Sequence, residues 1–553
     1  MILTISQFEI SVKMFAEKNV TNPDQHLRAW IAQRCGIAEE AVVSYAILHR
    51  SLDARRKPDI RLIYTLRVTV RDDVPISEDE HVVVSAPQPE QTHRLYHLTK
   101  SASVPTHPLI VGSGPAGLMA AYLLALHGCK PVILDRGYDV ERRHADIRRF
   151  HQTRDLNPES NYLFGEGGAG TFSDGKLYTR IKDDRIRFVL EAYVAARAPH
   201  RILYDHHPHI GSDILPLMCK RLRKQIEAWG GIFRWGAAVE DILMRNNRCA
   251  GVMLTNGERL DAPVTIIGCG HSARSLIQRI AAHGVAHRLK DFQLGCRIEH
   301  PQHLIDRTQY GWMPPRAILG AAEYTLTSRP PETLSLANVT TFCMCPGGEI
   351  IAATSDDGQL CTNGMSRFRR SGAFANAGLI VNQFASDFDS AAAAFSFLED
   401  LERRAFLAGA GDSLEQAYRC PAQSAAAFAR GEIGLQTRQT SYHFGLTPAR
   451  LDQILPKRTT AALQYALPYF ERVIRGFLSS GTLIGVETRV SSPVRFERHP
   501  ETLESSLPGL YLAGEGAGYA GGITSAALDG LRIAETILTG KPPYKNDGDT
   551  SKK

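Results

Sequence analysis

The first hundred residues carry the alternating pattern of a strand and the spacing of a short helix. Apolar and polar side chains alternate through 60–70, as in a strand with one buried face. A second strand is expected over 41–48, and a helix over 22–36 between a capping asparagine and a glycine stop. Prolines among polar residues from about 71 to 107 are typical of a linker or extended arm. These patterns predict a separate α+β domain and linker over residues 1–100.

A glycine-rich turn after the linker indicates a nucleotide site. The apolar strand 109–111 leads directly into GSGPAG and an apolar helical segment, and a second strand ends at Asp135. Gly112 permits the tight turn, Gly114 lets backbone approach a pyrophosphate, and Gly117 lets helix and strand pack closely. The helix N-terminus favours the negative charge of that pyrophosphate, and Asp135 is placed to accept hydrogen bonds from a ribose. The pattern predicts a dinucleotide site and leaves NAD and FAD open, because both share this half.

Two further glycine clusters indicate places where backbone approaches a flat ligand or an anion. Five glycines fall between Gly165 and Gly175, and their aromatic and leucine neighbours favour a packed loop over a flexible one. Later, the strand 510–513 leads into five glycines over 514–522 and a helix that begins near Thr524. The N-terminus of that helix is suited to the negative charge of a reduced flavin. The alternative there is an ordinary turn between strand and helix.

The segment 264–273 is open to two interpretations. Its GCGHSA sequence is compatible with a second dinucleotide turn for NAD(P)H, or with a chain crossover that touches the first site. We favour the crossover, because no following strand ends in an acid or an NADP-reading arginine at the expected distance. His271 is then expected to cap the helix that follows.

Four side chains are candidates for catalysis beside a cofactor. The thiols of Cys343 and Cys345 could exchange electrons with a flavin or form an adduct, although buried cysteine is also a common small apolar residue. Arg489 could clamp a carboxylate or phosphate if 487–495 is one alternating strand, with structural ion pairs as the competing interpretation. Lys176 is a weaker candidate for proton donation or anion contact. No set of residues has metal-ligand spacing, so no metal is expected.

Several longer segments resemble a known family. They include LIVGSGPAGLMAA (109–121), FGEGGAGTFSDGKL (164–177), IIGCGHSAR (266–274) and GLYLAGEGAGYAGGITSAALDG (509–530). The chain is similar to bacterial FAD-dependent dehydrogenases that carry an extra N-terminal domain, within the glutathione-reductase-like FAD superfamily. Asp135 stands where glutamate is usual, and Glu515 stands where the wider superfamily has aspartate, so the reach of each carboxylate differs by one methylene.

The resemblance implies bound FAD, with NAD(P)H as a candidate transient reductant. The residues expected to hold FAD lie on the glycine segments and next to them: Gly112, Gly114, Pro115, Ala116, Gly117, Asp135, Arg136, Gly168, Gly170, Val239, Gly270, Gly514, Glu515, Gly521, Gly522 and Ile523.

Composition narrows the class of protein. The chain has 553 residues and a formal net charge of +6. Its residues are 43% hydrophobic and 22% charged, and these fractions exclude a disordered or fibrous chain. Its longest apolar stretch, 118–126, is too short to span a bilayer, and its first residues lack a secretory signal. Ten cysteines form no disulfide-like framework. We therefore expect a soluble cytoplasmic protein without membrane contacts.

The expected fold class is α/β, with a Rossmann-type FAD-binding domain assembled from two chain segments, 106–290 and 480–542. An α+β substrate domain, 291–479, is expected between them, the small N-terminal α+β domain precedes them, and a polar tail occupies 543–553.

The expected function is that of an FAD-dependent oxidoreductase. A hydride would pass through flavin N5 to or from an unidentified small organic substrate. The main alternative is an RNA-binding or RNA-modifying flavoprotein, suggested by the basic loop Arg55-Arg56-Lys57. A nicotinamide-only dehydrogenase is a third candidate. The sequence assigns no oligomeric state, and nucleic acid is an unfavoured partner.

Overall fold

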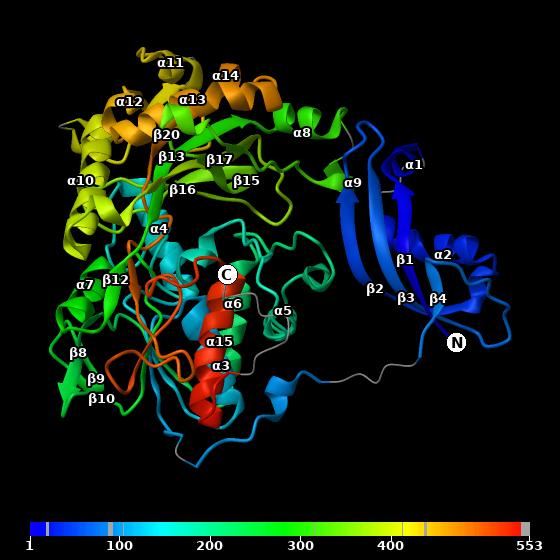
Figure 1. Ribbon diagram of the computed structural model, residues 1–553, viewed down its shortest axis with the longest axis horizontal. Coiled ribbons are helices and arrows are strands. Elements are labelled where there is room, and N and C mark those ends of the chain that lie inside the picture. The colour runs from blue at the N-terminus through cyan, green and yellow to red at the C-terminus, as the bar shows by residue number, and fades with distance from the viewer. Residues whose placement is uncertain are drawn as a thin grey trace.

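The computed structural model describes residues 1–17, 22–86, 92–102, 104–313, 316–411, 413–435 and 439–543. The predicted polar tail therefore lies outside the described residues, except for Pro543. Figure 1 shows a small N-terminal sheet beside a larger body, in which a parallel sheet and a second, larger sheet lie one above the other.

The N-terminal sheet is antiparallel, with strand order β2-β3-β1-β4. The strands of this sheet are β1 (Ile2–Ser11), β2 (Val42–Asp53), β3 (Arg61–Val70) and β4 (Val82–Val84). The same part of the chain contains the helices α1 (Val12–Glu17) and α2 (Leu27–Cys35). The alternation that predicted β3 is confirmed, because its even-numbered residues are buried and its odd-numbered residues are partly exposed. Strand β1 was not anticipated. A register shift between Ile5 and Phe8 interrupts its alternation, as a β-bulge does.

The parallel sheet has the order β22-β11-β5-β6-β7, and all of its neighbouring strands are parallel. These strands are β5 (Leu109–Val111), β6 (Val132–Leu134), β7 (Ile232–Arg234), β11 (Thr265–Ile267) and β22 (Leu510–Leu512). Two distant parts of the chain thus complete one Rossmann-type sheet, which confirms the predicted fold class. The same region contains α4 (Val140–Thr153), α5 (Arg185–Ala195), α6 (Leu215–Ala228), α7 (Arg274–Ala282), β8 (Val239–Arg245), β9 (Arg248–Leu254), β10 (Arg259–Asp261), β12 (His287–Leu289) and β21 (Val494–Phe496).

Helices α3 (Pro115–Leu126) and α15 (Ile523–Thr539) pack directly against each other (Figure 1). The contact is close at Gly530, where an added Cβ atom would lie 2.0 Å from the carbonyl oxygen of Ala116. A glycine in the interior of α15 therefore sets the distance between the two helices.

The larger sheet follows the path β14-β15-β17-β13-β20-β18-β19, with β16 paired to β15. Its strands are β13 (Phe292–Pro301), β14 (Thr327–Ser328), β15 (Val339–Ala352), β16 (Thr362–Met365), β17 (Phe374–Gln383), β18 (Cys420–Ser424), β19 (Leu446–Pro448) and β20 (Thr482–Glu487). Helices of this region are α8 (Gln302–Tyr310), α9 (Arg316–Leu319), α10 (Ala391–Ala410), α11 (Ala425–Arg430), α12 (Leu451–Ile454), α13 (Lys457–Val473) and α14 (Phe477–Ser480).

Strand β20 changes one expected boundary. It pairs with β13 and β18, so the chain is still part of the larger sheet at Glu487 and leaves it after that residue, not at 480. The segment 487–495 is also not one alternating strand, because β20 ends at Glu487 and β21 begins at Val494. Among the described residues, no helix combines the length and apolar character that crossing a membrane requires.

Candidate cofactor-binding site

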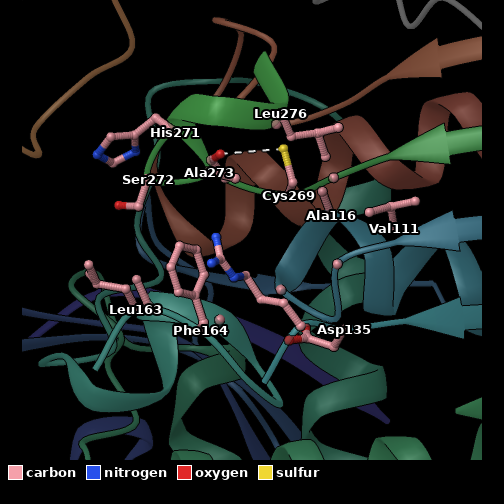
Figure 2. Close-up of a pocket in the computed structure, with 18 of the residues that line it drawn as sticks. Val111, Ala116, Asp135, Leu163, Phe164, Cys269, His271, Ser272, Ala273 and Leu276 are labelled. Atoms are coloured by element: carbon pink, nitrogen blue, oxygen red, sulfur yellow. Dashed lines mark hydrogen bonds between the residues drawn. The ribbon is translucent and has the colours of Figure 1, made fainter. Parts of the chain in front are cut away.

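A cavity of about 450 Å³ lies where the strands of the parallel sheet end. Figure 2 shows Val111, Ala116 and Asp135 on one side of it and Leu163 and Phe164 on another, with His271, Ser272 and Ala273 on the loop after β11. Ligands of open α/β sheets bind at the carboxyl ends of the strands, and the volume is typical of a small-molecule site.

The structure brings nearly all of the expected cofactor-binding residues to this cavity. Those that line it are Gly112, Gly114, Pro115, Ala116, Asp135, Arg136, Gly168, Gly170, Val239, Gly270, Gly514, Glu515, Gly521, Gly522 and Ile523. Gly117 is not part of the lining. A Cβ atom on Gly117 would lie 1.9 Å from the Gly112 carbonyl oxygen, so this glycine serves the close packing of turn and helix.

The first glycine turn is fixed by its contact with the loop after β11. Gly112 has φ +97°, and a Cβ atom there would lie 2.5 Å from the carbonyl oxygen of Gly268. Gly114 then caps α3 without a side chain, with Pro115 at the first helical position. The N-terminus of α3 is therefore bare backbone at the cavity wall, an arrangement suited to a phosphate group.

Asp135 holds the glycine loops together. One carboxylate oxygen accepts hydrogen bonds from the backbone N–H and hydroxyl of Ser113, at 2.9 and 2.6 Å. The other accepts from the N–H groups of Gly137 and Gly165, at 2.8 and 3.1 Å. The side chain is buried, and protein donors occupy both oxygens. Ribose binding by Asp135 thus remains a prediction, whereas its role in organising the loops is evident.

The glycine loop 164–175 is packed, as the sequence favoured. Arg143, fully buried, donates hydrogen bonds to the carbonyl oxygens of Asn161 and Glu166, both at 2.8 Å. The Glu166 carboxylate in turn pairs with Arg223 at 2.8 Å and accepts from the N–H of Val140. Burial raises the pKa of Glu166, while Arg223 opposes that rise. This ionic frame, which the sequence did not reveal, holds the loop against the cavity.

The N-terminus of α15 closes another side of the cavity. The hydroxyl of Ser525 accepts a hydrogen bond from the N–H of Gly522 at 3.1 Å, and the helix begins at Ile523. Glu515 accepts from the N–H of Ser492 at 2.9 Å through one oxygen. A Cβ atom on Gly521 would lie 2.8 Å from the other oxygen, so glycine at 521 leaves space beside this carboxylate.

The loop after β11 belongs to the same cavity. β11 lies between β5 and β22, and Cys269, Gly270 and His271 line the cavity, which agrees with the crossover interpretation. His271 does not cap the next helix, because α7 has Ala273 as its N-cap and no side-chain capping bond. Its Nε2 is buried and has no hydrogen-bond partner among the described residues, and burial lowers the pKa of the imidazole. His271 is therefore a lining residue whose role the sequence did not indicate.

At the opposite end, charged side chains border the cavity around Val239. Arg136 lies over the Phe164 ring, 4.1 Å from its centroid, and pairs with Glu159 at 2.8 Å. The lining also contains Arg279, which pairs with Glu240 at 3.0 Å. This part of the lining thus offers both apolar and polar side chains for contact with a ring system.

The four candidate catalytic side chains lie outside the lining of this cavity. Arg489 is buried and pairs with Glu402 and Asp356, both at 3.0 Å, so its guanidinium is already engaged by carboxylates of the chain. Lys176 pairs with Asp174 at 3.3 Å and lies beside the strand that carries Cys343 and Cys345.

The lining fits a dinucleotide such as FAD. Two helix N-termini, of α3 and α15, reach one cavity through glycine turns, and they favour negative charge there. Gly114 and Gly168 face each other so closely that a Cβ on Gly168 would lie 3.1 Å from the Gly114 Cα, and a side chain would fill this space.

Three parts of the chain match described families. Residues 291–490 match "FAD-dependent protein, C-terminal domain-like", 105–147 match "FAD binding domain", and 4–69 match a domain of unknown function. An uncharacterized protein of Clostridium beijerinckii is 35% identical over 514 residues, or 92% of this chain and 95% of that protein. The chain belongs to the same family. It is an FAD-dependent protein, and the prediction of FAD as its cofactor is confirmed.

Solved structures of low similarity include a dehydrogenase and an FAD-dependent halogenase. L-proline dehydrogenase from P. horikoshii matches with a TM-score of 0.33 and 11% identity, over 79% of this chain and 94% of that chain. The myxobacterial chondrochloren halogenase CndH matches with a TM-score of 0.34 and 15% identity, over 79% of this chain and 76% of that chain. At such values the substrates of those proteins do not transfer to this chain. The placement in the glutathione-reductase-like superfamily stays a prediction.

Proposed function

We propose that this protein transfers a hydride between the N5 atom of bound FAD and a small organic substrate, with NADH or NADPH as a reductant. The observation that carries the proposal is the convergence of α3, α15 and their glycine turns on one cavity. When bound, FAD supplies the two-electron chemistry, and the protein supplies binding, orientation and electrostatics.

Each end of the cavity suits one part of the cofactor. The bare N-terminus of α3 would hold the pyrophosphate, and the backbone near Val239 would contact the adenine. Glu515 has one oxygen beside Gly521 and is suited to accept a hydrogen bond from a ribityl hydroxyl. The N-terminus of α15 would stabilise negative charge at the flavin edge by about 0.3–1 kcal/mol or more.

The substrate surface is assigned to the larger sheet. Residues 106–290 together with 488–542 would form the FAD-binding domain, and 291–487 the substrate domain, with β20 included in the latter. Strand β15 contains both Cys343 and Ile351, and Ile351 belongs to the same buried apolar cluster as Phe164 of the cavity lining. A substrate held on this sheet would therefore lie close to the cavity that takes the cofactor.

The test is an anaerobic titration of the FAD-loaded full-length protein with NADH and, separately, with NADPH. Loss of flavin absorbance, with one oxidised nicotinamide formed per FAD, is the expected result for one of them. Reoxidation is then screened with small carbonyl and alkene compounds. Protein that keeps its oxidised spectrum with both nicotinamides, and with alcohols and amines as alternative hydride donors, would contradict the proposed hydride transfer.

A further inference from the structure

Cys343 and Cys345 lie two residues apart at an irregular point of β15. The pairing of β15 with β17 shifts register between Phe342 and Cys345, and again between Cys345 and Gly348. Cys343 has φ +41°, an uncommon backbone conformation for a residue with a side chain. Bulges of this kind re-aim side chains, and here the Cys345 thiol turns back to donate a hydrogen bond to the carbonyl oxygen of Cys343 at 3.3 Å. Cys345 is buried, whereas Cys343 is partly exposed.

Two cations are fixed beside this pair. Arg297 of β13 is fully buried and donates to the carbonyl oxygen of Cys343 at 2.8 Å, and it lies 3.8 Å from the sulfur of Cys345. Glu487 and Asn376 hold the guanidinium, at 2.8 and 2.9 Å. Such a tightly held cation stabilises a thiolate without having to reorganise.

The second cation arrives from the FAD-binding side of the molecule. Lys176 directly follows the glycine loop that lines the cavity, and its ammonium group donates to the carbonyl oxygen of Met344, between the two thiols. The same ammonium group forms an ion pair with Asp174 at 3.3 Å. The two thiols thus lie beside two cations, and the thiol of Cys343 is partly exposed. Reactive cysteines have such surroundings.

The acidity of the two thiols follows from this arrangement. The neighbouring Cys345 thiol, together with Lys176 and Arg297, lowers the pKa of Cys343 to about 6 against the opposing effect of burial. The pKa of Cys345 is raised. The charged or titratable groups that face the pair are Lys176, Arg297, Asp174, Glu487, Tyr178 and Tyr324. In contrast, burial raises the pKa of the cavity thiol Cys269 to about 12.

We propose that Cys343 and Cys345 form a redox-active dithiol that reduces small disulfides, with Cys343 as the attacking thiolate and Cys345 as the resolving thiol. The Cys343 sulfur attacks one sulfur of the disulfide, the S–S bond breaks, and one thiolate leaves. Cys345 then attacks the mixed disulfide, giving its proton to the second leaving thiolate. A Cys343–Cys345 disulfide forms, two electrons pass to the substrate, and two thiols are released.

The experiment uses the FAD-loaded full chain and dithiobis(nitrobenzoate), an aromatic disulfide whose released thiolate absorbs in the visible. Wild-type protein is expected to release two thiolates per chain in a fast phase and to retain no label on the peptide that carries both cysteines. Cys345→Ser should release one and keep the label on Cys343. Cys343→Ser should lose the fast phase, whereas Cys35→Ser, in the N-terminal domain, should leave it unchanged.

The pH profile adds a readout that does not depend on a variant. The fast rate should rise to a plateau with its midpoint near pH 6, not near the pH 9 of an unperturbed thiol. Lys176→Met should move that midpoint upward. A fast phase that survives Cys343→Ser, a single released thiolate with retained label in the wild type, or a wild-type rate still rising at pH 9 would overturn the proposal. These outcomes are independent of hydride transfer, so the two proposals fail separately.

Discussion

At the scale of single residues, space and backbone geometry decide which glycines the cofactor site needs. Gly112 and Gly128 both have positive φ, +97° and +75°. A Cβ atom on Gly112 would meet Gly268 at 2.5 Å, whereas one on Gly128 would meet no atom of the described residues within 4 Å. The two positions thus separate the cost of the backbone conformation from the cost of a clash at the cavity wall.

We therefore expect Gly112→Ala to be far more damaging than Gly128→Ala. A non-glycine residue with positive φ costs about 1–2 kcal/mol, and both variants pay this cost. Gly112→Ala must also displace the loop after β11, so its melting temperature should fall further and its FAD content should drop. Thermal unfolding and the flavin absorbance per chain measure the two effects. Equal losses in both variants would show that the contact with Gly268 is unimportant.

At the scale of elements, the sequence predicted those helices, strands and turns that a local pattern of residues determines. The glycine fingerprint located the turn between β5 and α3, and the alternation over 60–70 located β3. Strand β1 was missed because its bulge breaks the alternation. The burial of Arg297, Arg143 and Glu166 in ionic frames depends on partners distant in sequence, so no local pattern could reveal it.

One such buried group, His300 on β13, predicts acid sensitivity. Its Nε2 donates to the Phe477 carbonyl oxygen at 2.8 Å, its Nδ1 is buried without a hydrogen-bond partner in the described structure, and burial lowers its pKa to about 4. The unfolded chain, with a histidine pKa of about 6.5, binds this proton first as the pH falls. Between pH 7 and 5 the folded state should lose about 2 kcal/mol of stability through this group.

Urea unfolding at pH 7 and pH 5 tests the assignment. His300→Gln keeps a neutral donor that does not titrate, so its stability difference between the two pH values should be smaller than that of the wild type by about 2 kcal/mol. His303→Gln, on the exposed surface of α8, is the matched control and should behave as the wild type. An unchanged pH dependence in His300→Gln would mean that other groups cause the acid sensitivity.

At the scale of the whole molecule, the N-terminal sheet is joined to the larger body through its edge strand β2. Arg50 pairs with Asp24 at 2.8 Å and with Asp205, across the boundary, at 2.7 Å. The backbone also continues the contact, because the N–H of Arg50 donates to Tyr204 and the N–H of His206 donates to Arg50. Lys57 belongs to the basic loop that suggested RNA binding. Its ammonium group donates a hydrogen bond to the Thr308 carbonyl oxygen, so this loop also contacts the larger body.

Arg50→Gln should therefore loosen the N-terminal domain without emptying the cofactor site. The substitution leaves Asp24 and Asp205 close together without their shared cation, and removing one partner of such charged hydrogen bonds costs about 2 kcal/mol. That cost corresponds to a roughly thirtyfold larger population of detached domains. Limited proteolysis between residues 71 and 108 should accelerate accordingly, since cleavage follows the open population.

Arg55→Gln is the control, because Arg55 is 86% exposed and pairs with the nearby Asp53. If both variants are cleaved at the wild-type rate with full flavin absorbance, the backbone contacts alone hold the domains together, and the charge cluster at Arg50 serves only the N-terminal fold.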